Sequence, residues 1–152
     1  MAEITIRAYR EEDWPTLVSI HDPARKNELE LAGLSDAFLP LEIAAEREGL
    51  FDYTVVVAEA EGKVRGFAAY TPDELAWLYV STEYSRRGVG RALTRYVIEN
   101  TEERPLCLEA LVGNRPAFEL YKSVGFELKE TVNGRMPGNE SFAVSVWCME
   151  LE

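Results

Sequence analysis

The stretch from Leu75 to Leu93, which reads L-A-W-L-Y-V-S-T-E-Y-S-R-R-G-V-G-R-A-L, constrains the fold of this chain most strongly. Residues 75–80 are apolar or aromatic and predict a buried strand. From Val89 to Val97 the apolar residues recur with the period of a helix. The stretch therefore predicts a strand, a glycine-containing loop and the first turn of a helix. Backbone N–H groups at a helix start lack partners within the helix, so this turn favours a phosphate or pyrophosphate.

Two common phosphate-binding loops do not fit this turn. A P-loop requires Lys and then Ser or Thr after its second glycine, but Arg91 and Ala92 follow Gly90. A dinucleotide-binding fingerprint requires Gly or Ala three residues after its second glycine, where this chain has Leu93. Gly88 and Gly90 lack the Cβ atom that would hold a ligand away from the backbone. An ordinary strand-to-helix turn with solvated arginines remains the alternative.

Charge argues against one class of function and in favour of another. The net charge of −11 is unlike that of a nucleic-acid binder, which normally carries a basic face, so we expect no nucleic-acid partner. Residues 1–52 hold 12 acidic and 5 basic side chains, a net charge of −7. Arg86, Arg87, Arg91 and Arg95 nevertheless form a cluster without an acid between them. A basic cluster on an acidic chain favours a small polyanion, and a solvated helix face is the alternative.

Length and composition predict one soluble domain over residues 1–152, with 47% hydrophobic and 28% charged residues. No apolar run is long enough to span a membrane and the N-terminal residues do not resemble a signal peptide, so we expect no membrane partner. Cys107 and Cys148 lie in strand-like segments, which predicts buried thiols in a reducing cytoplasm. Because His21 is the single histidine, we expect no metal site.

A second stretch, Asn114–Phe126, reads N-R-P-A-F-E-L-Y-K-S-V-G-F. Together the two stretches resemble the GNAT superfamily of acyl-CoA-dependent N-acyltransferases, specifically over residues 75–126. The family's loop pattern, Gln/Arg-x-x-Gly-x-Gly/Ala, is met by Gly88 and Gly90, while Ser85 replaces its opening residue. The later pattern, Asn-x-x-Ala-x-x-x-Tyr-x-x-x-Gly-Phe, is complete. Its members here are Asn114, Ala117, Tyr121, Gly125 and Phe126.

The order of predicted elements agrees with this resemblance. We expect strands near residues 4–7, 53–58, 64–71, 75–80, 106–112, 126–131 and 142–151, and helices near 11–21, 28–34, 39–48, 89–100 and 116–124. Residues 133–139 read as a Gly/Pro/Asn-rich connection. The expected fold class is α/β (α+β) in a single domain. The resemblance implies a mixed, mostly antiparallel sheet with helices on both faces and a splay between the fourth and fifth strands.

The resemblance also implies a binding site for acetyl-CoA. Backbone groups of Leu78 and Val80 would meet the pantetheine arm in the splay, and one N–H would polarise the thioester carbonyl. Asn114 would hydrogen-bond the cofactor, and its position before Pro116 also suits a helix N-cap. The pyrophosphate would contact backbone N–H groups of the loop. These belong to Arg86, Arg87, Gly88, Val89, Gly90 and Arg91.

Two residues are candidates for the chemistry. Tyr121 matches the family's general acid, which protonates the leaving thiolate; a packing role is the alternative. Glu109 interrupts the apolar strand L-C-L-E-A-L-V, and ribosomal-protein alanine acetyltransferases of the superfamily place a general-base Glu at the matching position. An amine needs such a base, because an alkylammonium has a pKa of about 10.4. Glu74 or water could serve instead, and Glu109 could simply lie at the wet end of its strand.

We therefore expect an enzyme that transfers an acetyl group from acetyl-CoA to a primary amine by direct attack in a ternary complex, because neither cysteine has a matching histidine base. A small amine, a protein N-terminus and a lysine side chain all stay open as acceptors. A non-catalytic acyl-CoA sensor is the alternative from another class, and a homodimer is an oligomeric state that the sequence leaves open. Acids of the N-terminal third predict a cationic acceptor, unless they only face solvent. They are Glu28, Glu30, Asp36, Glu42, Glu46 and Glu48.

Overall fold

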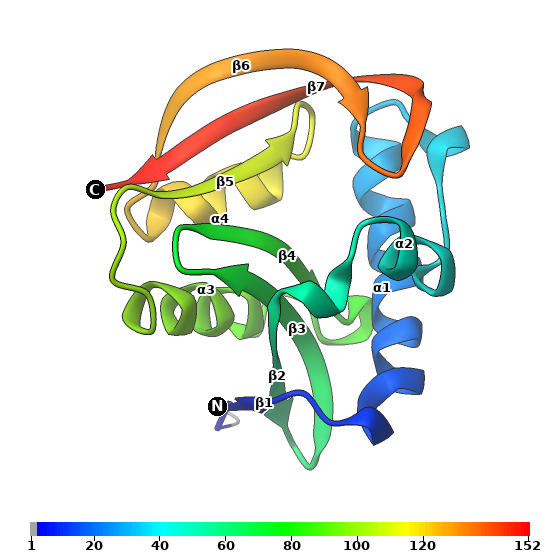
Figure 1. Ribbon diagram of the computed structural model, residues 1–152. Helices are drawn as coiled ribbons and strands as arrows, with labels where there is room; N and C mark the ends of the chain where they lie inside the picture. Colours follow the sequence, from blue (N-terminus) through cyan, green and yellow to red (C-terminus); the bar gives the residue numbers. More distant parts are fainter. Residues whose placement is uncertain (1–2) are drawn as a thin grey trace.

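A computed structural model describes residues 3–152 of the chain and, within them, a seven-stranded sheet in the order β1-β2-β3-β4-β5-β7-β6 (Figure 1). The strands are β1 (Thr5–Ala8), β2 (Thr54–Ala60), β3 (Lys63–Thr71), β4 (Glu74–Val80), β5 (Leu106–Leu111), β6 (Glu127–Met136) and β7 (Asn139–Leu151). Neighbouring strands are antiparallel except β4 and β5, which are parallel. A parallel pair needs a crossover connection, and a helix between β4 and β5 supplies it.

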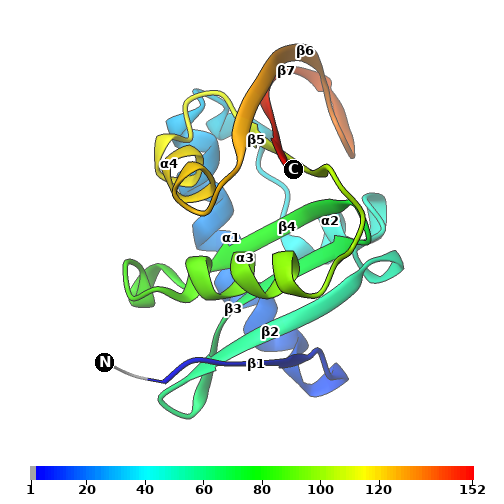
Figure 2. The same cartoon turned by 90° about the vertical axis from the view of Figure 1, so that its left-hand side faces the viewer.

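Helices cover both faces of the sheet, as Figure 2 shows with α3 in front of the strands and α1 behind them. The helices are α1 (Trp14–Leu31), α2 (Leu41–Arg47), α3 (Val89–Glu99) and α4 (Arg115–Ser123), with short 3-10 helices at Glu11–Asp13, Ser35–Ala37, Leu50–Asp52 and Thr82–Tyr84. Successive residues of β2 alternate between the faces: Val55 and Val57 pack with α1 and α2, and Val56 and Ala58 pack with α3. The predicted fold class and layer arrangement are confirmed.

The splay between the fourth and fifth strands is also confirmed. Glu74 and Cys107 are the one residue pair in register between β4 and β5 within the described chain. Beyond this pair the two strands diverge, so β4 is paired with β3 on one edge and with no strand on the other (Figure 1). The backbone of residues 76–80 therefore has groups left for a ligand.

A bulge in β4 changes which side chains face each helix layer. Leu75 pairs with Tyr70 and Trp77 pairs with Ala69, which leaves Ala76 without a partner in β3. Leu75 packs in the core beneath α3 and α4, whereas Trp77 packs in the core beneath α1 and α2. In an unbroken strand these two side chains would share a face. The bulge thus turns the second half of β4 toward α1.

The prediction of separate helices at 11–21 and 28–34 is wrong, because α1 continues from Trp14 to Leu31. It does so despite Pro23, which has no N–H to donate to the preceding turn. Burial of apolar residues on both sides of Pro23, including Leu17 and Leu29, stabilises the helix across this defect. The helix ends with Gly33 at φ +73° and a 2.8 Å hydrogen bond from Leu34 N to Leu29 O.

The predicted connection at residues 133–139 is much shorter than expected. Strand β6 continues to Met136 and β7 begins at Asn139, so only Pro137 and Gly138 lie between them. The polar residues are tolerated because β6 is an exposed edge strand. The hairpin tip contacts the other side of the molecule: Asn139 Nδ2 donates to Ala37 O at 3.0 Å, and Arg47 Nη1 donates to Gly138 O at 3.0 Å.

Candidate active site

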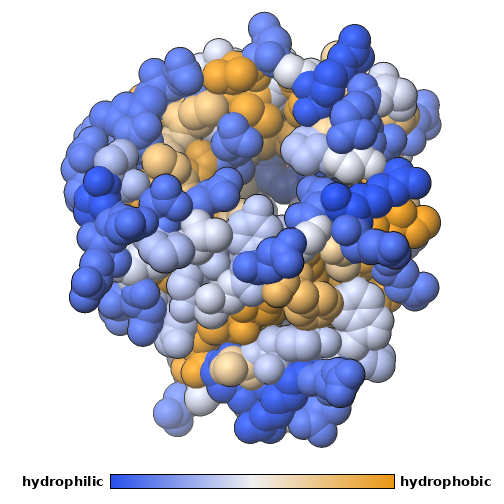
Figure 3. Space-filling model, viewed as in Figure 1, coloured by the Kyte–Doolittle hydropathy of each residue, from blue (hydrophilic) through white to orange (hydrophobic). Residues whose placement is uncertain are grey.

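A cavity of about 300 Å³, here called the central cavity, lies where β4 and β5 diverge. Its walls come from α1, α2, β4, β5, α4 and the β6–β7 hairpin. The space-filling view is hollowed beneath this hairpin (Figure 3). Several polar side chains line the cavity among apolar ones. They are His21, Arg25, Glu28, Glu48, Glu74, Tyr79, Glu109, Tyr121 and Arg135.

Tyr121 lies on α4 with its side chain lining the central cavity, and only 8% of the residue is exposed. Its ring meets that of Phe126 edge-on, with the centroids 6.0 Å apart. Its hydroxyl forms no hydrogen bond with another residue of the described chain, 3–152. Burial raises the pKa of Tyr121, and the negative charge of Glu28 raises it further. The phenol therefore keeps its proton at neutral pH and can donate it into the cavity.

Glu28 is the most heavily hydrogen-bonded carboxylate of the cavity. Its Oε1 accepts hydrogen bonds from Arg25 Nη1 at 2.5 Å and from Tyr79 OH at 3.0 Å. Its Oε2 accepts one from Asn114 Nδ2 at 3.2 Å. Burial, together with the charge of Glu28, raises the pKa of Tyr79 well above its usual value, so this phenol is a permanent donor.

Asn114 is the N-cap of α4, as expected, because its Oδ1 accepts a 3.4 Å hydrogen bond from Ala117 N. Its side-chain NH2 group donates to Glu28, and the residue is buried. Both ends of the amide are therefore engaged within the protein. A contact from Asn114 to the cofactor stays a prediction.

Glu109 and Glu74 line the central cavity from the two strands that diverge. Glu109 is exposed on β5, and Cys148 Sγ lies 3.7 Å from its Oε2. Glu74 is half-buried; burial raises its pKa, and the charges of Glu109 and Asp73 raise it further. Of the two carboxylates, Glu109 is the one open to solvent, while Glu74 keeps its proton to a higher pH than an isolated glutamate.

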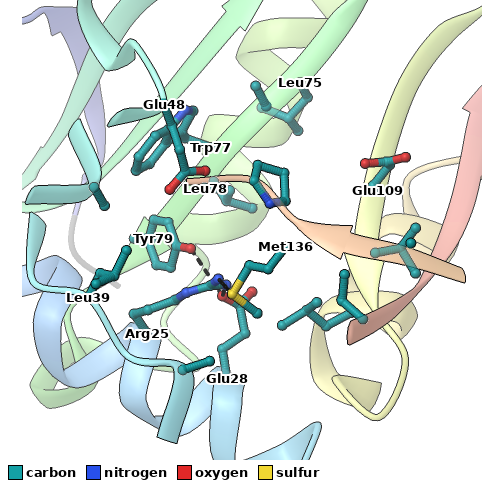
Figure 4. Close-up of a pocket in the computed structure, with 18 of the residues that line it drawn as sticks. Arg25, Glu28, Leu39, Glu48, Leu75, Trp77, Leu78, Tyr79, Glu109 and Met136 are labelled. Carbon is teal, nitrogen blue, oxygen red and sulfur yellow. Dashed lines mark hydrogen bonds and ion pairs between the residues drawn. The ribbon is translucent and has the colours of Figure 1, made fainter. Parts of the chain in front are cut away.

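The predicted acidic wall is only partly present. Four of its six acids, Glu30, Asp36, Glu42 and Glu46, are exposed and do not line the cavity. Glu28 and Glu48 do line it, and Glu28 is already paired with Arg25. Figure 4 shows Glu48, Tyr79, Arg25 and Glu28 gathered on one side of the cavity and Glu109 on the other.

Glu48 differs from Glu28 because its carboxylate forms no hydrogen bond or ion pair with another described residue. Burial raises its pKa, the charge of Arg25 lowers it, and those of Glu140 and Glu28 raise it. The hairpin tip packs against it, since a Cβ added to Gly138 would lie 3.0 Å from Glu48 Cγ. The acidic side chains that the cavity offers a ligand are thus Glu48, Glu74 and Glu109, and only Glu48 of these is among the six acids predicted from the sequence.

The glycine-containing loop has the conformation of an anion-binding turn. Arg86 and Gly88 both have positive φ, at 62° and 88°, and Gly88 is the N-cap of α3. The first intrahelical bond runs from Ala92 N to Gly88 O at 3.0 Å, so the N–H groups of residues 89–91 precede it and are free for a ligand. The loop and helix arginines are exposed and form no ion pair within residues 3–152. They are Arg86, Arg87, Arg91 and Arg95.

Gly90 lies at a tightly packed position, and its contact with the cofactor stays a prediction. A Cβ on Gly90 would lie 3.1 Å from Leu120 Cδ2 and 3.6 Å from Val80 Cγ2, so that position faces α4 and β4 rather than open solvent. Gly88 meets nothing nearer than 3.9 Å, and its positive φ is what favours glycine there. Leu78 and Val80 are half-buried on β4, beside its unpaired edge.

Among the cavity residues that were not predicted from the sequence are Arg25, Tyr79 and Met136, and Arg25 Nη2 lies 3.7 Å from Met136 Sδ. A signal for Arg25 does exist, because His21, Arg25 and Glu28 recur at helical spacing and form a polar stripe once α1 is read as one helix. His21 is not a helix-end residue but is buried within α1, with 1% exposed and Nδ1 2.9 Å from Asp22 Oδ1. Burial lowers its pKa.

Residues 3–152 contain no group of three or more His, Cys, Asp or Glu side chains arranged to hold a metal ion. Their helices include none that is both long and apolar enough to cross a membrane.

Residues 51–128, which are just over half of the chain, match the family model described as the acetyltransferase (GNAT) domain. The chain therefore belongs to the GNAT family of acetyltransferases. Its glycine-containing turn and its splayed strands lie within the matched residues.

Three similar proteins are informative. The peptidyl-lysine N-acetyltransferase YiaC of Escherichia coli is 36% identical over 73 residues, which are 47% of this chain and 49% of YiaC, so the match spans about half the length of that relative. The crystal structure of a ribosomal-protein-alanine N-acetyltransferase from Brucella melitensis is 28% identical, with a TM-score of 0.70 over 96% of this chain and 98% of the other. The structure of yncA from Salmonella typhimurium with its cofactor acetyl-CoA is 19% identical and shares the fold, with a TM-score of 0.66 over 98% and 93% of the two chains.

Proposed function

We propose that the protein transfers an acetyl group from acetyl-CoA to a primary amine. The observation that carries this proposal is the Tyr121 hydroxyl, which lines a cavity at the splay of the sheet, keeps its proton and has no partner among the described residues. Family membership supports it, and so does the Salmonella structure of the same fold, whose description includes acetyl-CoA. The free phenol favours an enzyme over an acyl-CoA sensor, because mere binding does not need a proton donor.

We expect acetyl-CoA to contact two sets of backbone groups, one in the turn before α3 and one along β4. The pyrophosphate would meet the N–H groups of the turn at residues 86–91, with the positive end of the α3 dipole behind them. The exposed arginines around that turn add positive charge. The pantetheine arm would follow the unpaired edge of β4 past Val80 and Leu78, which brings the thioester toward Tyr121.

In the proposed reaction the neutral amine attacks the carbonyl carbon of the thioester while both substrates are bound. A β4 backbone N–H stabilises the developing oxyanion. The C–S bond then breaks, and Tyr121 protonates the leaving thiolate. Glu109, exposed at the cavity, takes the proton of the attacking amine; Glu74 or water are the alternatives. The proposal gives Cys107 and Cys148 no part, because neither side chain lines the central cavity and neither has a histidine base.

The acceptor is either a small amine or a peptide amine. A peptide is favoured by the names of two relatives, the peptidyl-lysine enzyme YiaC and the ribosomal-protein-alanine enzyme of Brucella. A small amine is favoured because the tip of the β6–β7 hairpin contacts α2 and Ala37 and so covers one side of the central cavity, which leaves less room for a peptide.

Cofactor binding and an acceptor screen test the proposal together. Saturating acetyl-CoA should raise the melting temperature, and pantetheine without its phosphates should do so much less. A panel of amines and peptides, assayed by release of free thiol, should then identify acceptors. Unchanged melting and a flat calorimetric titration with acetyl-CoA would contradict the assignment.

Three expectations about the surroundings stay proposals. We expect a cytoplasmic location, which suits the free thiols of Cys107 and Cys148. We expect one domain over residues 1–152, without a nucleic-acid or membrane partner. Sedimentation would decide between a monomer and a homodimer.

A further inference from the structure

The two halves of the splayed sheet are bridged by a side chain from a third element. Strand β4 and the β5–α4 unit are joined in register by one residue pair, Glu74 and Cys107, at the closed end of the splay. Away from this pair they are connected through Glu28 of α1, whose side chain lies next to Tyr79 in the cavity (Figure 4). Tyr79 on β4 donates to Oε1 of Glu28, and Asn114 at the start of α4 donates to Oε2.

Each contact of this bridge is anchored in its own element. Asn114 is tied to β5 by a 3.0 Å hydrogen bond from its N to Leu111 O, and to α4 by its cap on Ala117. Arg25 holds the bridging carboxylate in place from one turn earlier on α1. The side chain of Glu28 is 21% exposed, so these hydrogen bonds are largely shielded from water.

We propose that Glu28 is a positioning residue that fixes the separation of β4 from α4 and, through α4, the place of the Tyr121 hydroxyl. Tyr121 is seven residues beyond Asn114 on the same short helix, so movement at the cap carries the phenol with it. Across the splay from Tyr121 lie the backbone N–H and C=O groups of β4 that are not paired with another strand. The role of Tyr121 as acid rests on the proposed function, whereas the bridge itself does not.

Glu28→Gln should break one arm of the bridge selectively. Arg25 and Tyr79 both donate to the same oxygen, so the new amide oxygen stays with these two donors. The new NH2 group then faces Nδ2 of Asn114, which is also a donor. Asn114→Asp alone places two carboxylates against each other, although Asp still caps α4. In the double variant Glu28→Gln/Asn114→Asp the NH2 group meets a carboxylate, which restores the hydrogen bond with its polarity reversed.

Amide hydrogen exchange tests the bridge without any assay of activity. Each single variant should speed exchange in residues 114–121 by about tenfold or more, and the double variant should return it to within about threefold of the parent. Glu30→Gln, an exposed acid on the same helix, is the matched control and should change nothing. Unchanged exchange in the single variants, or a double variant as fast as the faster single one, would overturn the bridge.

A double-mutant cycle tests the route through Tyr121. Glu28→Gln should lower kcat by about tenfold in the parent but by less than about threefold in a Tyr121→Phe background, where no phenolic proton is left to position. An equal factor in both backgrounds would overturn this route. A parent without acyltransferase activity on any acceptor would remove the proposed function, and hydrogen exchange would still decide the bridge.

Discussion

The side chain of Tyr121 is buried and yet lines the central cavity, so its hydroxyl is shielded from bulk water but accessible to a bound ligand. A phenol with a raised pKa stays protonated as the pH rises through neutrality, so loss of this proton does not limit the reaction in that range. The same burial makes the side chain part of the core, together with Phe126. Its two roles, packing and proton donation, can be separated by experiment.

Tyr121→Phe should lower kcat by about 100-fold or more, because only the proton donor is removed while the ring remains. Acetyl-CoA affinity, measured by calorimetric titration, should change little. Tyr70→Phe, at a half-buried tyrosine that does not line the central cavity, is the control. A loss of less than about threefold on a good acceptor would make Tyr121 a packing residue.

The unpaired carboxylate of Glu48 predicts that the cavity prefers a cationic acceptor. We expect a diamine to have a higher kcat/KM than a carboxylate-bearing amine of similar size, and the advantage to shrink as salt rises. Glu48→Gln should remove the preference, whereas Glu46→Gln, on the exposed face of α2, should keep it. A preference that survives Glu48→Gln, or one indifferent to salt, would show that Glu48 does not select the acceptor.

Glu74 provides a prediction about stability and pH. Its pKa is raised in the folded protein from an ordinary value of 4.5, so between that pH and the raised value the folded state holds more protons than the unfolded chain. Stability from this group is present below pH 4.5 and is lost as the pH rises through this window. Glu74→Gln should therefore raise the melting temperature at pH 7 and have little effect on it at pH 4. The control Glu42→Gln, at an exposed position, should leave the melting temperature unchanged at both pH values. Equal gains at both pH values would contradict the assigned cause.

At the scale of elements, local patterns predicted most of the strands and helices but missed the continuity of α1 and the bulge in β4. The strand, turn and helix at residues 74–99 and the N-cap at Asn114 were confirmed because hydrophobic period, glycines and capping residues all act over a few positions. The continuity of α1 through Pro23 was missed because burial against the sheet, which stabilises it, is a tertiary effect. The bulge at Ala76 was missed for the same reason, since only the partner strand reveals it.

The close approach of α3 to α4 makes Gly90 a test of packing against binding. Gly90→Val should destabilise the protein by about 1–3 kcal/mol through overpacking against Leu120, and it should also weaken acetyl-CoA binding. Adding Leu120→Ala makes room and should recover part of the melting temperature. Recovery of the full acetyl-CoA affinity in that double variant would show that Gly90 acts through packing alone.

At the scale of the whole molecule, the sequence named Tyr121, Glu109 and Glu74, and the structure brings all three to one cavity. The sequence did not predict which other residues line the cavity or how they contact one another. Asn114 and Glu28 are 86 residues apart, and Arg25 and Met136 are 111 apart. Such contacts depend on how the hairpin and α1 meet, which no local pattern encodes.

The chain crosses the splay only once between β4 and β5, by way of α3 and the segment that leads to Leu106. This segment is the one covalent link across the splay, and the two sides are otherwise held together by the Glu74–Cys107 pair, the Glu28 bridge and the core they share. If the chain were cut in that segment, the two polypeptides would still share a core and the Glu28 bridge, and acetyl-CoA would lie at their interface. If acetyl-CoA binds across the splay, it would then promote the association of the two polypeptides. Their association would report the concentration of acetyl-CoA.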